Sequence, residues 1–154
     1  MRSLSIIYAT GSGHTEYVIE TLQAFLKEHA PKLKISVQRA EQTQPEDLLK
    51  SDVLLLACGT WNTGGTEGQL HPFMHTLLND RSKDIDLKKK PCALIALGDS
   101  RYYYTARATE HLTQFVLKHN GISGLSPLLI IGEPYGQEDR VRVFCEKLLQ
   151  FLSQ

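Results

Sequence analysis

The stretch Leu4–Thr15 reads LSIIYATGSGHT, and it determines how the rest of the chain is interpreted. Its first half is an apolar run typical of a buried strand. Its second half, Thr10–Thr15, holds two glycines and three hydroxyl side chains but no Lys or Arg. Apolar residues then recur at spacings of three and four, which predicts a helix over about 16–29. A strand, a tight polar loop and a helix N-terminus together are typical of an anion-binding site, because free N–H groups of the first helical turn point into the loop.

The composition of this loop narrows the kind of anion. A P-loop ends in Gly-Lys-Ser/Thr, and this loop has no lysine. A dinucleotide-binding fingerprint needs a third glycine, but Glu16 stands at that position. We therefore expect a single phosphate monoester held by neutral donors. The alternative left open by the loop alone is an ordinary strand-to-helix turn capped by Thr or Ser.

Composition sets further limits. The 154 residues fit one domain, 1–154, with room for a core. Basic and acidic residues number 17 each, and this zero net charge argues against nucleic acid as the main partner. No apolar stretch approaches the roughly 20 residues of a membrane span, and the N-terminal residues show no signal-peptide pattern. The three cysteines lie far apart in apolar runs, which predicts reduced, buried thiols and a cytoplasmic protein.

Strand and helix patterns alternate along the chain. After the first strand, further strands are expected at 34–39, 53–58, 92–97 and 128–131. Helices are expected at about 16–29, over Leu70–Leu78, up to about His119 with Gly121 as its C-cap, and over about 137–152, with a short helical turn at 45–49. Five strands alternating with helices predict an α/β fold, a three-layer, doubly wound parallel sheet.

Three of the expected strands end in unusual loops: Thr10–Thr15, Gly59–Thr66 and Gly98–Tyr104. Ligands of doubly wound sheets bind outside the carboxyl ends of the strands, so these loops are expected to meet. The second loop contains Trp61, and the third contains three consecutive tyrosines. This set suits a phosphate monoester attached to a flat aromatic ring that is sandwiched between Trp61 and a tyrosine.

The three loops resemble those of the flavodoxins, and the resemblance extends over essentially the whole chain. Thr10-x-Ser12-Gly13-His14-Thr15 is similar to their phosphate loop. Gly59-Thr60-Trp61 resembles the loop whose Trp covers the inner face of the flavin, and Gly98-Asp99-x-x-Tyr102 resembles the loop whose Tyr stacks on the outer face. The resemblance implies a flavodoxin-like sheet with strand order 2-1-3-4-5. Because no break is evident near 128–131, it also implies the short-chain subgroup.

The resemblance further implies non-covalent FMN. The phosphate would lie on the N–H and hydroxyl groups of Thr10–Thr15, and Trp61 and Tyr102 would flank the isoalloxazine. Tyr104 would lie near the ribityl chain, and the backbone around Asp99 would reach the pyrimidine side. The full set of expected cofactor-binding residues is Thr10, Gly11, Ser12, Gly13, His14, Thr15, Thr60, Trp61, Asn62, Thr63, Gly64, Gly98, Asp99, Tyr102 and Tyr104.

No residue of this set is expected to act as a catalytic acid, base or nucleophile, and no metal site is expected. His71 and His75 stand four residues apart on a predicted helix, but the sequence shows no third ligand near them. They are interpreted as surface or helix-face residues.

The function that the resemblance implies is low-potential one-electron transfer by a monomeric carrier between redox proteins, a reductase donor and an acceptor enzyme. Such a protein is an electron carrier rather than an enzyme, because the chemistry belongs to the flavin. Two alternatives remain open: an FMN-dependent NAD(P)H:quinone-type reductase, and a dedicated flavodoxin-like activator of one enzyme. A flavin-free binding module of the same fold is a third reading.

The sequence departs from the family pattern in two ways. After Trp61 the family commonly has Gly followed by Asp, and this chain has Asn62-Thr63. Reduction flips a peptide there, and Asn adopts positive φ less freely than Gly, so we expect a less stable one-electron-reduced flavin than in Gly-containing relatives. Flavodoxins are also usually strongly acidic, whereas this chain is neutral, so a partner recognised less by charge is expected.

Overall fold

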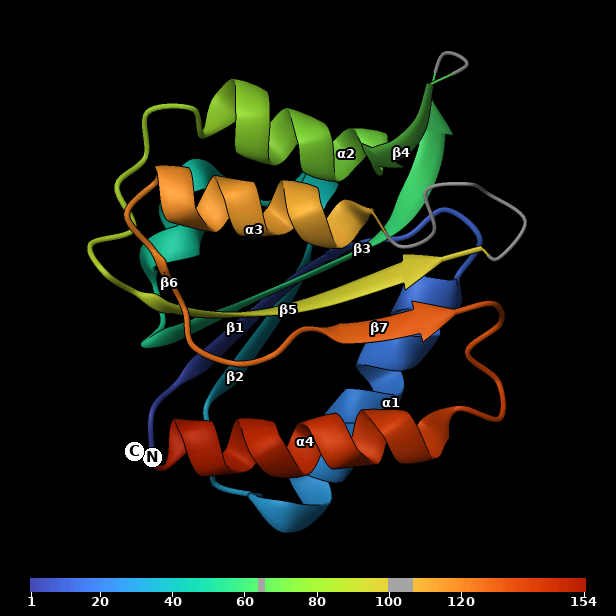
Figure 1. The fold of residues 1–154 in the computed structure, drawn as a ribbon. Coiled ribbons are helices and arrows are strands. Elements are labelled where there is room, and N and C mark those ends of the chain that lie inside the picture. Colours follow the sequence, from blue (N-terminus) through green and yellow to red (C-terminus); the bar gives the residue numbers. More distant parts are fainter. Residues whose placement is uncertain (64–65, 100–106) are drawn as a thin grey trace.

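The computed structural model describes residues 1–63, 66–99 and 107–154, with the backbone alone at 62, 63, 66 and 67. Its centre is a parallel sheet (Figure 1). β1 (Leu4–Ala9) pairs with β2 (Ile35–Arg39) on one side and with β3 (Val53–Thr63) on the other. β3 pairs with β5 (Pro91–Gly98), and β5 pairs with β7 (Leu128–Ile131). Numbered along the chain as parallel positions, this is the predicted order 2-1-3-4-5.

Helices cover both faces of the sheet (Figure 1). On one side lie α1 (His14–His29) and α4 (Glu138–Leu152). On the other lie α2 (Pro72–His75), its π-helical continuation η3 (Thr76–Arg81), and α3 (Ala108–Lys118). Two short 3₁₀ helices, η1 (Ala40–Gln42) and η2 (Pro45–Leu49), connect β2 to β3. The predicted three-layer arrangement is confirmed.

Alternation along the strands explains why there are two cores. Successive side chains of a strand point to opposite faces. Ile6 and Leu55 therefore pack in the core under α1 and α4, whereas Ile7 and Leu56 pack in the core under α2 and α3. Strands buried on both faces need apolar residues at every position, which is why these strands read as continuous hydrophobic runs.

The prediction of a loop at Gly59–Thr66 is wrong, because β3 continues to Thr63 and forms a hairpin with β4 (Thr66–Leu70). Thr60 pairs with Leu70 and Trp61 with Gln69 in an antiparallel ladder, so Leu70 belongs to a strand rather than to the next helix. Thr and Trp favour strands, and the sequence places Gly64-Gly65 between the two arms, a pair that favours hairpins.

The fifth strand position is built from two pieces rather than one. β6 (Ile122–Ser123) pairs with Pro91 and Cys92 at the start of β5, and β7 pairs with Ile95–Gly98 further along. The expected strand at Leu128–Ile131 is confirmed, but the edge position has an interruption over residues 124–127, which include Pro127. Proline cannot donate to a ladder, and it therefore favours such a position.

Gly121 does not cap α3 as expected. Asn120 has the left-handed backbone at φ 64°, whereas Gly121 has an ordinary φ. The glycine at 121 is required by packing, since a Cβ there would lie 2.8 Å from Leu87 Cδ1 and 2.9 Å from Val116 Cγ1.

All three cysteines are free and buried, as predicted. Burial raises the pKa of the thiols of Cys58 and Cys92 to about 12, and that of Cys145 to about 11. Within the described ranges, no helix combines the length and hydropathy needed to traverse a bilayer.

The Asn120–Gly121 pair yields a prediction about stability. Gly121→Ala should lower the free energy of unfolding by about 1–3 kcal/mol, because the added methyl overpacks Leu87 and Val116. Asn120→Gly should change it by less than about 1 kcal/mol, since glycine adopts positive φ freely. Urea denaturation measures both values. A larger loss for Asn120→Gly than for Gly121→Ala would contradict this assignment of the helix end.

Candidate functional site

The carboxyl ends of β1, β3, β5 and β7 border a cleft of about 890 Å³. Its volume lies in the range typical of pockets that bind small molecules and cofactors. The residues that line it are Ala9, Thr10, Gly11, Ser12, His14, Thr15, Gly59, Thr60, Trp61, Leu97, Gly98, Asp99, Gly132 and Glu133. The described parts of all three expected loops therefore meet at one edge of the sheet.

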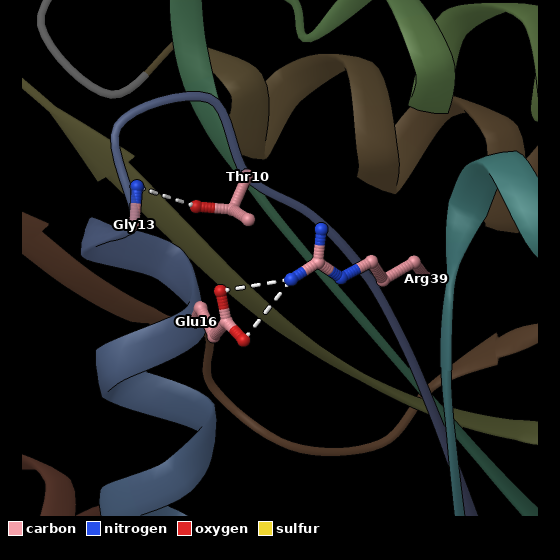
Figure 2. Close-up of polar contacts among 4 residues, drawn as sticks. All are labelled: Thr10, Gly13, Glu16 and Arg39. Atoms are coloured by element: carbon pink, nitrogen blue, oxygen red, sulfur yellow. Dashed lines mark hydrogen bonds and ion pairs between the residues drawn. The ribbon is translucent and has the colours of Figure 1, made fainter.

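The loop between β1 and α1 presents hydrogen-bond donors to this cleft. Gly13, the N-cap of α1, has φ +92°, a conformation that favours glycine. Its N–H donates to Thr10 Oγ1 at 3.0 Å, so the Thr10 hydroxyl proton is free to donate elsewhere (Figure 2). By helix geometry, the next three N–H groups, up to that of Glu16, have no acceptor within the helix. The loop thus combines backbone and hydroxyl donors at the positive end of a helix.

An ion pair balances the one acidic side chain of this first helical turn. Arg39 Nη2 lies 3.1 Å from both carboxylate oxygens of Glu16 (Figure 2). The neighbouring Tyr8 hydroxyl and the charge of Glu16 raise the pKa of Arg39, so the guanidinium stays charged. A carboxylate alone at this end of α1 would repel a bound anion. Arg39 offsets that charge, and the donors that face the cleft are neutral.

Trp61 packs the hairpin against the loop between β1 and α1. Its indole is 37% exposed and lies directly against Gly11, where an added Cβ would come within 2.4 Å of Trp61 Cζ2. The neighbouring Thr60 is buried, and its hydroxyl accepts a hydrogen bond from the Ala108 N–H at 3.1 Å. Thr60 therefore anchors the hairpin to the start of α3 while Trp61 faces the cleft.

Only some of the other expected site residues are found lining the cleft. Gly98 and Asp99 line the cleft, as expected. Gly13 shapes the loop but does not line the cleft. Asn62 and Thr63 are the last two residues of β3. Gly64, Tyr102 and Tyr104 lie outside the described residues.

Sequence reasoning missed a fourth loop. Gly132 and Glu133, directly after β7, also line the cleft, and the Gly132 N–H donates to the Gly98 carbonyl at 2.8 Å. The available signal was a glycine at the end of the fifth strand, which ends at the same sheet edge as the others. Ala9 and Leu97 at the strand ends were also missed, and Gly59, although part of the second expected loop, was not among the expected cofactor-binding residues.

The interpretation of His71 as a surface residue is wrong. Its side chain is 4% exposed and lies beside Trp61, whereas His75 is exposed as expected. His71 precedes Pro72 and caps α2 instead of lying within it, which directs its ring inward. The described residues include no group of three or more His, Cys, Asp or Glu side chains arranged to hold a metal.

Comparison with known proteins identifies the family. The family model described as Flavodoxin matches residues 6–144. This chain belongs to the flavodoxin family. Membership makes it a small flavin-binding electron-transfer protein.

Similar flavodoxins span nearly the same length. A probable flavodoxin 2 of Bacillus subtilis (strain 168) is 28% identical over 155 aligned residues, covering 100% of this chain and 94% of that protein. A flavodoxin of Nitratidesulfovibrio vulgaris (strain DSM 19637 / Miyazaki F) is 26% identical, covering 99% of this chain and 100% of that protein. The solved structure of oxidised Flavodoxin 2 from Bacillus cereus aligns with a TM-score of 0.85 at 23% identity, covering 96% of this chain and 98% of that one. A short-chain flavodoxin associated with a non-canonical PDU bacterial microcompartment aligns with a TM-score of 0.82 at 24% identity, with 99% coverage of both chains.

The close approach of Trp61 to Gly11 yields a prediction that needs no cofactor. Gly11→Ala should displace the indole, shift its fluorescence emission to the red and increase its quenching by acrylamide. Trp61 is the only tryptophan of the chain, so the emission reports this site alone. Ser12→Ala is the matched control, because Ser12 is exposed in the same loop. Equal emission of the Gly11→Ala variant and the wild-type protein would contradict the contact.

Proposed function

We propose that this flavodoxin binds FMN non-covalently in the cleft and carries single electrons at low potential between a reductase and an acceptor enzyme. The observation that carries the proposal is the contact at Gly11 and Trp61 between the loop at a helix N-terminus and an aromatic side chain. A phosphate monoester attached to a flat ring matches both parts of this site at once. When bound, FMN supplies one-electron redox chemistry, and the protein supplies binding and electrostatics.

The expected site residues fit this cofactor in different roles. The N–H and hydroxyl groups of Thr10–Thr15 would hold the phosphate, and Trp61 would cover one face of the ring. Gly98 and Asp99 would present backbone groups to the ring edge. Tyr102 and Tyr104 remain proposed for the outer face and the ribityl side. Asn62, Thr63 and Gly64 remain proposed for the hairpin end beside the ring.

The charges of the cleft support a low potential. Among the described residues that line it, none is Lys or Arg, and two are acidic, Asp99 and Glu133. Adding an electron to a group in such a surrounding is disfavoured by repulsion from fixed negative charge and from the phosphate itself. We also propose a monomeric carrier in the cytoplasm, a location supported by its three unpaired thiols.

Stepwise anaerobic reduction followed by absorption spectroscopy tests the proposal. The purified protein should take up FMN stoichiometrically and pass through a spectrally distinct one-electron-reduced form. It should not oxidise NADPH rapidly without an added reductase. Reduction in a single two-electron step with rapid NADPH oxidation would indicate a reductase instead. Failure to bind added FMN would overturn the proposed cofactor.

A second prediction concerns Asn62. The β3–β4 ladder shifts register between Trp61 and Thr63, so the backbone at Asn62 is locally irregular, as it is at β-bulges near functional sites. We expect reduction of the flavin to require a positive φ at this position. Asn62→Gly should therefore increase the amount of the one-electron-reduced form, because glycine removes the cost of that angle, about 1 kcal/mol. Asn62→Ala should decrease it, since alanine resists positive φ more than asparagine does. Equal accumulation in both variants, measured in the same reductive titration, would contradict this role for the position.

A further inference from the structure

His71 occupies a central place beside the cleft without lining it. It lies between the end of β4 and the start of α2, and its side chain is almost completely buried. Its Nδ1 accepts a hydrogen bond from the Phe73 N–H at 3.1 Å, which caps α2. With Nδ1 acting as the acceptor, the neutral ring carries its proton on Nε2.

The same ring reaches two parts of the flavin site. Its centroid lies 4.6 Å from that of Trp61, with an interplanar angle of 68°, an edge-to-face contact. The ring also lies close to the backbone of Thr10, the first residue of the loop between β1 and α1. One buried imidazole therefore connects α2, the hairpin tryptophan and the anion-binding loop.

The surroundings of His71 favour the neutral ring. Burial lowers its pKa, while the charge of Glu41 and the nearby Thr10 backbone act in the opposite direction. Cys58 of β3 lies near the backbone of His71, but burial raises the pKa of its thiol to about 12, so it stays uncharged. Protonation at Nδ1 would remove the acceptor for the Phe73 N–H. Only the neutral ring can accept at Nδ1 and donate at Nε2 together.

The indole is thus in contact on two sides. Gly11 of the phosphate loop lies against its six-membered ring, and His71 packs against it from the α2 side. We propose that His71 is a positioning residue, which sets the Trp61 indole and the Thr10 backbone relative to each other and thereby the distance between the ring and phosphate parts of the cofactor site. The functional part of this inference rests on the proposed binding of FMN.

Two variants separate the contacts of His71. His71→Asn keeps a side chain that caps helices well but removes the aromatic ring. His71→Phe keeps a ring beside Trp61 but removes the acceptor for the Phe73 N–H and the polar ring edge near Thr10. His75→Asn is the matched control, because His75 is exposed one turn further along the same helical segment. Urea denaturation verifies that each variant is folded.

Fluorescence of flavin-free protein gives the first readout. A protonated imidazole quenches indole more strongly than a neutral one, so wild-type emission from Trp61 should fall at a pH below the usual titration range of histidine. This transition should persist in His75→Asn and vanish in both His71 variants. A transition that survives in His71→Asn overturns the proposal.

Affinities for FMN and for riboflavin, which lacks the phosphate, give the second readout. His71→Asn should weaken both ligands roughly five- to tenfold, through loss of the aromatic contact that holds the indole. His71→Phe should weaken FMN more than riboflavin, because the polar ring edge that it removes lies near Thr10, in the loop proposed to hold the phosphate. Unchanged affinities in a folded His71→Asn variant overturn the proposal. If wild-type protein binds neither ligand, the proposed function fails, while the emission titration still decides whether His71 contacts Trp61.

Discussion

Parallel pairing of the buried strands is the constraint on which the site depends. Because β1, β3, β5 and β7 run in the same direction, their carboxyl ends meet at one sheet edge, and four loops from distant parts of the chain converge there. Burial on both faces fixes the register, since a slip of one residue would move every side chain into the opposite core. The contact between Gly11 and Trp61, fifty positions apart in the sequence, follows from this register.

The way in which the cleft could bind an anion depends on the charged side chains that line it. The described lining residues include no Lys or Arg, and Arg39 is held by Glu16 at the side of α1. An anion at this position would depend on oriented N–H groups and hydroxyls rather than on a counter-ion. Such donors would hold a phosphate by geometry while leaving its charge without a counter-ion.

Much of this arrangement could be read from the sequence. Continuous apolar runs gave the central strands, and the Thr10–Thr15 loop gave the start of α1, because both depend on local patterns. The hairpin could not be predicted, since its pairing depends on β4, a polar strand with no apolar alternation. Asn120 has the left-handed backbone that was expected at Gly121, and the glycine at 121 is instead required by the closeness of Leu87 and Val116. The burial of His71 depends on its position before Pro72 and on packing with Trp61, which no spacing rule encodes.

The three buried cysteines have a practical consequence. Their thiols are free, and burial holds the pKa of each well above neutral, so very little thiolate forms in the native protein. Because the thiols are buried, alkylating reagents would react only with molecules that have unfolded around them. Residues 58 and 92 lie on adjacent central strands of the sheet. Labelling at those two positions would thus count the molecules in which the sheet itself has separated, without any optical probe.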